Sequence, residues 1–388
     1  MSFKKIHSIY LVSGLFNVTN SMLFTTYFLY LTNVLNLSYT QATLLDLPLF
    51  ITQFFVELPS GFFADKYGYK KAVVIGTLAL TIAPLIFFLT TSYPILLFAG
   101  VFYGIGFAFI SGAFDALAYE TFDSDLKSFL TIRNLIQNIV NIIVPIITIW
   151  STQILNLRTF YLIDFLFHLV IIVILIFGVK EIKKVQEYSG YSFDFIKVGW
   201  ASVSMQLHSS KALVYQANSQ FLWGISKTAI DLFWIKLIEI SAGQDNIGFV
   251  FALASIVGII GNIMAYKLKI IKTAFWLSFL IHSIFIIFAG VFIGSTFAII
   301  CVLGQSFFIN LHEVLSQLII NKIVQVDRAS MFSFFSFLSG IGKIISILSV
   351  GFIADTYGVG SVWILAGLII IIISWQLYMV QKHIEKRI

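Results

Sequence analysis

Apolar runs of about 20 residues recur along the chain, and each is long enough to cross a bilayer as a helix. Six such runs precede residue 180, near 8–32, 41–62, 70–90, 94–119, 129–151 and 159–179. Six more follow residue 211, near 212–240, 246–266, 273–292, 295–320, 329–352 and 360–381. The pattern therefore predicts an all-α polytopic membrane protein with twelve transmembrane helices in two six-helix bundles. The predicted domains are 1–179, a linker at 180–211, and 212–388.

Basic residues are distributed unevenly between alternate polar breaks. The two termini, the linker and the breaks on the same side hold 20 of the 24 Lys and Arg residues. The opposite breaks hold only Arg158, and Lys227, Lys236 and Lys343 fall within predicted spans. Because Lys and Arg concentrate in cytoplasmic loops, both termini and the linker are predicted to be cytoplasmic. The bias also supports the count of spans, since one missed helix would reverse the side of every later loop.

The composition excludes a soluble protein. The chain is 59% hydrophobic and 11% charged, with a mean hydropathy of +0.97, which leaves too few polar side chains to cover a soluble surface. The basic lead MSFKKIH precedes a span too long for a cleavable signal, so we expect no signal peptide. The lone Cys301 excludes disulfides within the chain. The net charge of +6 reflects lysines at the membrane surface rather than a nucleic-acid groove.

The most specific pattern lies in the break between the second and third spans, where Glu57 to Lys71 is ELPSGFFADKYGYKK. Its glycines permit a sharp reversal of the chain. Asp65 is suited to accept hydrogen bonds from free amides at a helix start, and the lysines belong on a cytoplasmic face. The sequence therefore predicts a tight, charged hairpin between two spans.

This pattern resembles the loop between the second and third helices of the major facilitator superfamily of secondary transporters, with Tyr69 where the family usually carries Arg or Lys. The resemblance implies two six-helix bundles that rock around a midplane site to give alternating access. It also implies a gating loop that holds the inner side closed when the cavity opens outward. The predicted residues of this gating loop are Gly61, Asp65, Lys66, Gly68, Lys70 and Lys71.

Charged residues near the same membrane face are the predicted partners of the gating loop. Span 4 ends with SGAFDALAYE at 111–120, whose small residues permit close helix packing. This run resembles the fourth helix of a bacterial drug-efflux-like branch of the superfamily. We predict a gate that links Asp65 with Asp115, Glu120 and Arg133, with Glu57 beside the loop. Ordinary interfacial charges are the alternative.

Ionisable residues within spans cost several kcal/mol unless they are paired or hydrated. Lys227 and Asp231 lie one helical turn apart near the middle of span 7, so their side chains can meet on one face. Lys343 in span 11 has no acidic residue within a turn, and Asp46 lies near the outer side of span 2. These four are the predicted residues for substrate binding or proton coupling. A self-neutralising pair at span 7 and a helix cap at Asp46 are the structural alternatives.

Other polar residues within spans give weaker signals. Span 5 keeps Pro145 but has none of the glycines of the motif that proton-coupled exporters often carry there. Its amides at Gln137, Asn138 and Asn141 suit either a ligand or a neighbouring helix. Three histidines fall within spans, where a contact between helices is the more common role and a proton relay the alternative: His168, His282 and His312.

A second stretch repeats the gating loop in outline. Residues 351–358, GFIADTYG, match 61–68, GFFADKYG, at most positions but lack the lysine. The predicted topology places this second copy on the outer side, between spans 11 and 12. Repeats of inverted topology within each half would account for the echo, and so would convergence on a good hairpin.

Nothing in the sequence predicts an enzyme. It has no phosphate-binding glycine loop followed by Lys-Ser/Thr, no metal-spaced His/Glu pair and no soluble domain of a size to bind ATP. We expect no cofactor and no metal, and we expect the energy for transport to come from an ion or substrate gradient.

The favoured function is proton-coupled efflux of drug-like or lipophilic compounds. Symport uptake of a small metabolite, facilitated diffusion and a non-transporting membrane sensor are the alternatives. We expect a monomer in a bacterial cytoplasmic membrane, with no nucleic-acid partner.

Overall fold

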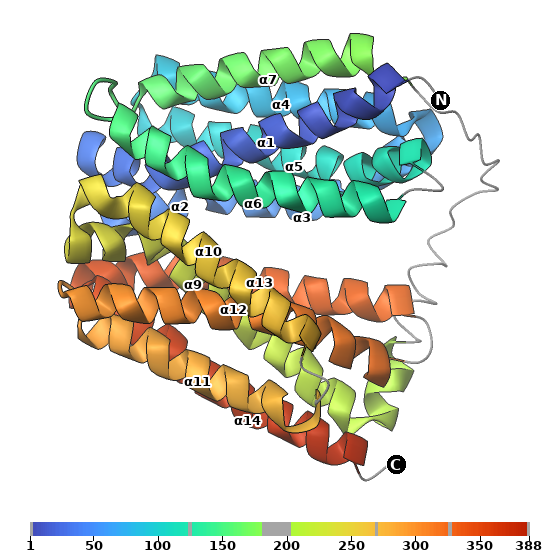
Figure 1. Ribbon diagram of the computed structural model, residues 1–388, viewed down its shortest axis with the longest axis vertical. Coiled ribbons are helices and arrows are strands. Elements are labelled where there is room, and N and C mark those ends of the chain that lie inside the picture. Colours follow the sequence, from blue (N-terminus) through green and yellow to red (C-terminus); the bar gives the residue numbers. More distant parts are fainter. Residues whose placement is uncertain (1–2, 123–125, 181–202, 268–270, 325–327, 386–388) are drawn as a thin grey trace. The chain divides into compact units, whose positions relative to one another are not determined.

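The computed structural model describes residues 3–122, 126–180, 203–267, 271–324 and 328–385, and every regular element in these ranges is a helix (Figure 1). The chain divides into two compact units, each of which packs mainly within itself. The first unit contains α1 to α7, and residues 247–252 group with it. The second unit contains α9, the rest of α10, and α11 to α14.

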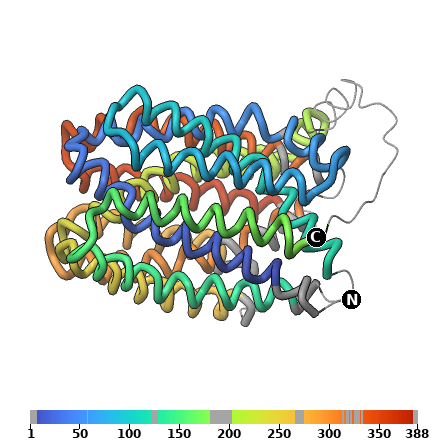
Figure 2. Tube along the Cα trace, turned by 90° about the horizontal axis from the view of Figure 1, so that it is seen from above, coloured from blue at the N-terminus to red at the C-terminus, as the bar shows by residue number. Residues whose placement is uncertain are grey.

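The first unit is built around α1, α4 and α5. Its packed pairs are α4–α5, α3–α5, α4–α7, α1–α6 and α1–α7, and Figure 2 shows α7 in green along α1 in dark blue. Buried apolar side chains such as Val12, Phe114 and Leu175 join these helices in one cluster. The elements are α1 (Phe3–Leu29), the π-helix η1 (Tyr30–Val34), α2 (Tyr39–Leu44), α3 (Leu47–Tyr67), α4 (Tyr69–Leu89), α5 (Tyr93–Phe122), α6 (Leu126–Ser151) and α7 (Thr159–Gly178).

The second unit repeats the order of packing of the first. Its pairs α11–α12, α11–α14, α9–α13 and α9–α14 correspond to α4–α5, α4–α7, α1–α6 and α1–α7. In each unit the first span therefore packs against the fifth and sixth, and the third span packs against the fourth and sixth. The elements are α9 (Lys211–Ala242), the 3₁₀ turn η3 (Gln244–Asn246), α10 (Ile247–Lys267), α11 (Ile271–Val291), α12 (Thr296–Ile323), α13 (Arg328–Tyr357) and α14 (Val359–Glu385).

A helix, or a pair of consecutive helices, occupies each of the twelve ranges predicted as spans. Within the described ranges, seven helices are individually long and apolar enough to cross a membrane, and Tyr39–Glu57 with Pro59–Tyr67, taken as one bent span, makes an eighth. α9 is not among them, and it is the helix that carries two ion pairs. The structure confirms an all-α polytopic membrane fold. The domain boundaries stay predictions, and most of the linker 180–211 lies outside the described residues.

Candidate functional site

The reversal between α3 and α4 is shorter than the sequence predicted. α3 continues through Pro59 and ends at Tyr67, so most of the predicted loop is helical. α3 bends at Pro59, where the axes of Tyr39–Glu57 and Pro59–Tyr67 differ by 49°, because proline removes a helical hydrogen bond. The reversal itself needs one residue, Gly68, whose φ of 111° is accessible to glycine and unfavourable for other residues.

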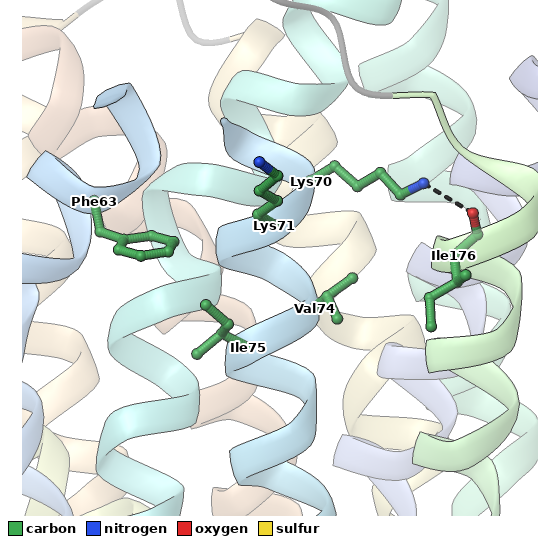
Figure 3. A pocket seen from close by; sticks show the side chains of 6 residues that line it. All are labelled: Phe63, Lys70, Lys71, Val74, Ile75 and Ile176. Carbon is green, nitrogen blue, oxygen red and sulfur yellow. Dashed lines mark hydrogen bonds between the residues drawn. The ribbon is translucent and has the colours of Figure 1, made fainter. Parts of the chain in front are cut away.

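Lys70 joins the start of α4 to the end of α7. Its Nζ donates hydrogen bonds to the carbonyl oxygens of Ile176 at 2.8 Å and Val179 at 2.6 Å, the first of which is drawn in Figure 3. Carbonyl groups in the last turn of a helix have no partner within the helix, and a cation is favourable at that end. Lys70 therefore connects two helices of the first unit at their predicted cytoplasmic ends.

A shallow depression of about 470 Å³ lies beside this contact. It is lined by apolar side chains of α3, α4 and α7, with two lysine amines above them in Figure 3. Such walls suit an apolar chain better than a polar solute, so we do not assign a transported solute to it. The lining residues are Phe63, Lys70, Lys71, Val74, Ile75 and Ile176.

Asp65 forms a hydrogen bond with the residue that departs from the family pattern. The Tyr69 hydroxyl donates to Asp65 Oδ1 at 3.1 Å. The N-cap of α4 is Gly68, with no side-chain cap, so Asp65 does not fill the capping role that the sequence suggested. The other members of the predicted gating loop, Gly61 and Lys66, are exposed on the last turns of α3.

Two of the predicted gate partners meet across neighbouring helices. Arg133 Nη1 of α6 lies 2.6 Å from Asp115 Oδ1 of α5, and the Arg133 guanidinium also lies over the Phe114 ring. Glu57 is exposed and Glu120 is half-buried. Asp65 bonds to Tyr69 rather than to Arg133. The gate linking all four residues stays a prediction.

Lys227 and Asp231 form an ion pair near the middle of α9. Lys227 Nζ lies 2.6 Å from Asp231 Oδ2, one turn along the same helix face, as the spacing predicted. The two side chains are 33% and 42% exposed, so protein covers neither fully. A second pair, Lys236 with Glu239 at 2.8 Å, follows toward the end of α9 and is more buried. Sequence reasoning missed this second pair, although its i, i+3 spacing was a usable signal.

Lys343 lies on the helix that packs against α9 near the ion pair. α9 and α13 cross closely because Gly224 and Gly342 face the partner backbone at Ser339 and Phe221, where a Cβ atom would collide. One turn beyond Lys343, the Ser346 hydroxyl donates to the carbonyl of Ile225 at 2.9 Å. The crossing therefore places Lys343 of α13 at the level of the α9 segment that directly precedes Lys227.

Asp46 lies at the joint between α2 and α3. It occupies the N-cap position of α3, but its side chain makes no capping hydrogen bond. Instead, the Tyr27 hydroxyl of α1 donates to Asp46 Oδ1 at 2.7 Å. The alternative of a simple helix cap is therefore wrong, and Asp46 connects two elements of the first unit.

The structure adds a buried acid that sequence reasoning missed. Asp164 of α7 is fully buried and its Oδ1 lies 3.4 Å from Nδ1 of buried His168, one turn along the helix. Tyr161 stacks on Phe87, with ring centroids 4.8 Å apart. A lone carboxylate inside the apolar run 159–179 was the available signal.

A sequence model described as the Major Facilitator Superfamily matches residues 9–309 of the chain. No curated protein sequence matches it. Evidence on the function of this chain therefore comes from its family, from the geometry of the site and from similar solved structures.

Three solved transporters share the fold at low sequence identity. A point mutant of the nucleoside transporter NupG superposes with a TM-score of 0.82 at 14% identity, over 97% of this chain and 99% of that one. A bacterial homologue of the human lysosomal transporter Spinster gives 0.77 at 12% identity, over 100% and 98%. A structure titled for proton-dependent oligopeptide transporters gives 0.74 at 13%, over 99% of both chains. At such identities the likeness concerns the fold alone.

Proposed function

The chain belongs to the major facilitator superfamily, and from that premise we propose a proton-coupled transporter in which the Lys227–Asp231 pair binds a small polar solute. Membership makes the chain a secondary transporter. The proposal adds the class of solute, the residues that bind it and the coupling ion. Alternating access of the kind described for this fold would expose the pair to each side in turn.

The exposure of the Lys227–Asp231 pair is the observation that carries the proposal. Both side chains are partly uncovered at mid-span. Facing hydrocarbon would cost several kcal/mol per charge, so charged residues at this depth face the bundle interior or water. The uncovered face of α9 is therefore best explained as the wall of an aqueous cavity.

The pair offers a solute both a cation and an anion on one helix face. A zwitterionic or strongly hydrogen-bonding solute can exchange its own groups for the internal ion pair without leaving a charge unpaired. Lys343, on the packed helix α13, would supply a further cation. This chemistry favours a small metabolite over an apolar drug. The similar structures include a nucleoside transporter and a structure titled for oligopeptide transporters.

A polar stripe on α6 supports an aqueous path in the first unit. Asn134, Gln137, Asn138 and Asn141 follow the spacing of one helix face. Asn134 and Gln137 are exposed, and the other two are half-buried. Amides exposed at mid-span favour water or solute over lipid.

Efflux of a lipophilic cation is the second candidate, and the first unit provides the observation for it. Tyr27 and Tyr161 surround Phe87 with ring centroids 6.0 and 4.8 Å away, and Asp46 accepts the Tyr27 hydroxyl. Aromatic faces beside a carboxylate are the groups that bind lipophilic cations. The resemblance of span 4 to a drug-efflux-like branch favours the same function.

The test is solute flux into proteoliposomes with and without an imposed proton gradient. Zwitterionic metabolites, nucleosides and a lipophilic dye such as ethidium would be compared. Wild type should accumulate a polar solute, and Asp231→Asn or Lys227→Gln should lower the rate about tenfold or more, the effect of losing about 1.4 kcal/mol. Glu239→Gln, in the second ion pair of the same helix, is the matched control and should retain transport.

The outcomes separate the hypotheses. Gradient-dependent movement of dye alone would replace the polar-solute proposal by efflux of lipophilic cations. Movement that ignores the proton gradient would indicate facilitated diffusion. An unchanged rate for a polar solute in Asp231→Asn would contradict the assigned site, and no flux of any compound would favour the membrane-sensor alternative.

A further inference from the structure

Two histidines from different helices meet inside the second unit. His282 of α11 and His312 of α12 are 0% and 1% exposed. Their ring centroids lie 4.9 Å apart, with the ring planes inclined by 62°. Trp223 of α9 closes the group, 6.2 Å from one ring and 6.4 Å from the other. Three helices of one unit therefore enclose the imidazole pair.

The ring nitrogens of this pair lack protein partners of good geometry. Among the described residues, no hydrogen bond of good geometry reaches a nitrogen of either ring, and the Ser278 backbone makes only a weak contact with His312. Leaving a buried polar group unpaired costs about 1–3 kcal/mol. Four such atoms at one place are costly for a contact that only packs helices, and this cost points to a ligand shared between the rings.

The surroundings of the pair accommodate one positive charge. Phe279 stacks on His312 with ring centroids 3.7 Å apart and planes inclined by 7°. An aromatic face stabilises a cation placed over it, and Trp is the most effective of the aromatic residues in this role. The aromatic rings of Trp223 and Phe279 thus flank the pair.

The charged groups closest along the packed helices are Lys227 and Asp231 on α9, and Lys343 on α13, which crosses α9 at Gly224. Trp223 lies one turn before Lys227, which is paired with Asp231. In the described parts of α11, α12 and α14, the polar side chains around the level of the pair are uncharged, and they include Ser278, Ser283 and Gln305. Glu313 follows His312 in sequence, and its side chain lies outside the described residues.

We propose that His282 and His312 together bind one proton, and that this site couples proton movement to the solute bound at Lys227–Asp231. A proton from the aqueous phase adds to a nitrogen of one ring, and the resulting N–H donates to the bare nitrogen of the other. The pair gains one positive charge and no covalent bond within the protein breaks. A second proton is disfavoured because two adjacent cations repel.

Trp223 connects the proton site to the solute site. It contacts both imidazole rings and precedes Lys227 by one turn on the same helix. Charging the histidine pair therefore changes the field at the ion pair that the solute must open. This coupling role rests on the proposed function, whereas the binding of a proton does not.

A metal ion is the competing ligand for two histidines. Structural zinc takes four protein ligands and catalytic zinc at least three. Among the described residues, no three His, Cys, Asp or Glu side chains come together as a metal site. A proton needs only the two nitrogens, so it fits the residues present better.

The first experiment measures proton binding without any solute. The full-length protein, labelled with ¹⁵N-histidine in lipid nanodiscs, would be titrated by NMR, with His282→Gln and His312→Gln to assign the signals. We expect the two rings to bind one proton in a single shared titration step. In each single variant, the remaining histidine should no longer show that step. Independent titration of the two rings, or no titration at all, would overturn the proposal. A stoichiometric Zn²⁺ or Cu²⁺ complex that both variants abolish would replace the proton by a metal.

The second experiment tests coupling. In proteoliposomes, His282→Gln and His312→Gln should lose proton-driven accumulation while still exchanging labelled for unlabelled solute across the membrane. His383→Gln, a control on α14 whose ring bonds to the Met379 carbonyl, should accumulate solute like wild type. Full accumulation in both variants would reject the coupling role. If wild type moves no solute, the proposed function fails while the NMR titration still decides the proton site.

Discussion

The same eight-residue hairpin occurs once in each unit, and the two copies fold alike. In both, a helix ends at a tyrosine, one glycine reverses the chain and the next helix begins at once, at 67–69 and at 357–359. The Gly68 amide donates to the Ala64 carbonyl at 2.9 Å, and the Gly358 amide donates to the Ala354 carbonyl at the same distance. The φ angles of the two glycines are 111° and 83°. The residues shared between GFFADKYG and GFIADTYG therefore suffice to specify the reversal.

The residues that differ determine what each hairpin contacts. In the first copy Lys70 extends from α4 to the last carbonyls of α7. In the second copy the equivalent position is Gly360, which packs against the backbone of α11 at Gly290, where a Cβ atom would lie 2.5 Å from the carbonyl oxygen. One hairpin is held by a long cation and the other by close backbone contact. The shared residues therefore form the turn, and the residues that differ set the contacts of each hairpin.

The largest expected difference between the hairpins is in transport. If the first copy is the gate, Asp65→Asn should lower the initial rate of solute flux about tenfold, equivalent to about 1.4 kcal/mol. The amide can still accept the Tyr69 hydroxyl, so the fold should persist while the charge is lost. Asp355→Asn makes the same change in the copy without lysines, and flux should stay near wild type.

Flux assays of purified, reconstituted variants would decide this comparison. Equal losses in Asp65→Asn and Asp355→Asn would mean that the acid serves the hairpin and not a gate. A loss confined to Asp355→Asn would place the functional hairpin between α13 and α14 and remove the reason to assign gating to residues 61–71.

An effect on stability rather than on transport, equal in both copies, is expected from the reversal glycines. Gly68→Ala and Gly358→Ala each force a side chain into a backbone region used almost only by glycine, at a cost of about 1–3 kcal/mol. Thermal unfolding in detergent would measure the loss. Gly61→Ala is the matched control, because Gly61 is helical with nothing within 4 Å of an added Cβ, and alanine there should stabilise by up to about 1 kcal/mol. A Gly68→Ala protein as stable as wild type would contradict the turn geometry.

The sequence predicted the helices well because lipid imposes the pattern directly. Runs long enough to span, and lysines on one side, are properties of single segments, and every predicted range holds a helix. The Lys227–Asp231 pair was predictable for the same reason, since both members lie on one helix at a spacing of four. Pro59 shows the limit of local patterns. α3 bends there and continues to Tyr67, beyond the predicted end of the span near residue 62, because neighbouring turns remain hydrogen-bonded.

Contacts between helices were not predictable from one sequence. Tyr27 with Asp46, and His282 with His312, join helices whose rotation about their axes depends on packing. In a chain this apolar, hydrophobic residues face lipid as well as protein, so periodicity does not mark the inward face. Lys70 illustrates the consequence: the sequence placed it in the gating loop at the cytoplasmic face, and the structure adds its contact with the end of α7.

The contact of Lys70 gives the third prediction. Lys70→Met removes two hydrogen bonds to carbonyls at a helix end and should destabilise the first unit by about 1 kcal/mol. Lys71→Met is the matched control, since Lys71 is exposed on the neighbouring position and such changes usually stay within about 0.5 kcal/mol. Hydrogen exchange of the last turn of α7 would detect the difference. Equal protection in both variants would show that Lys70 does not hold that turn.

The smallest expected effect concerns Tyr69, which has Val359 as its counterpart in the second hairpin. Tyr69→Phe removes the hydroxyl that donates to Asp65, at a cost of about 0.5–1.5 kcal/mol for one neutral donor. Tyr67→Phe, at an exposed position, is the control.

Tyr69→Arg instead supplies the cation typical of the family, and an ion pair with Asp65 should stabilise the closed hairpin more than the hydroxyl does. If Tyr69→Arg slows flux while Tyr69→Phe speeds it, the strength of the Asp65 contact sets how readily the gate opens. If both variants match wild type in flux and melting temperature, the contact is incidental to the hairpin.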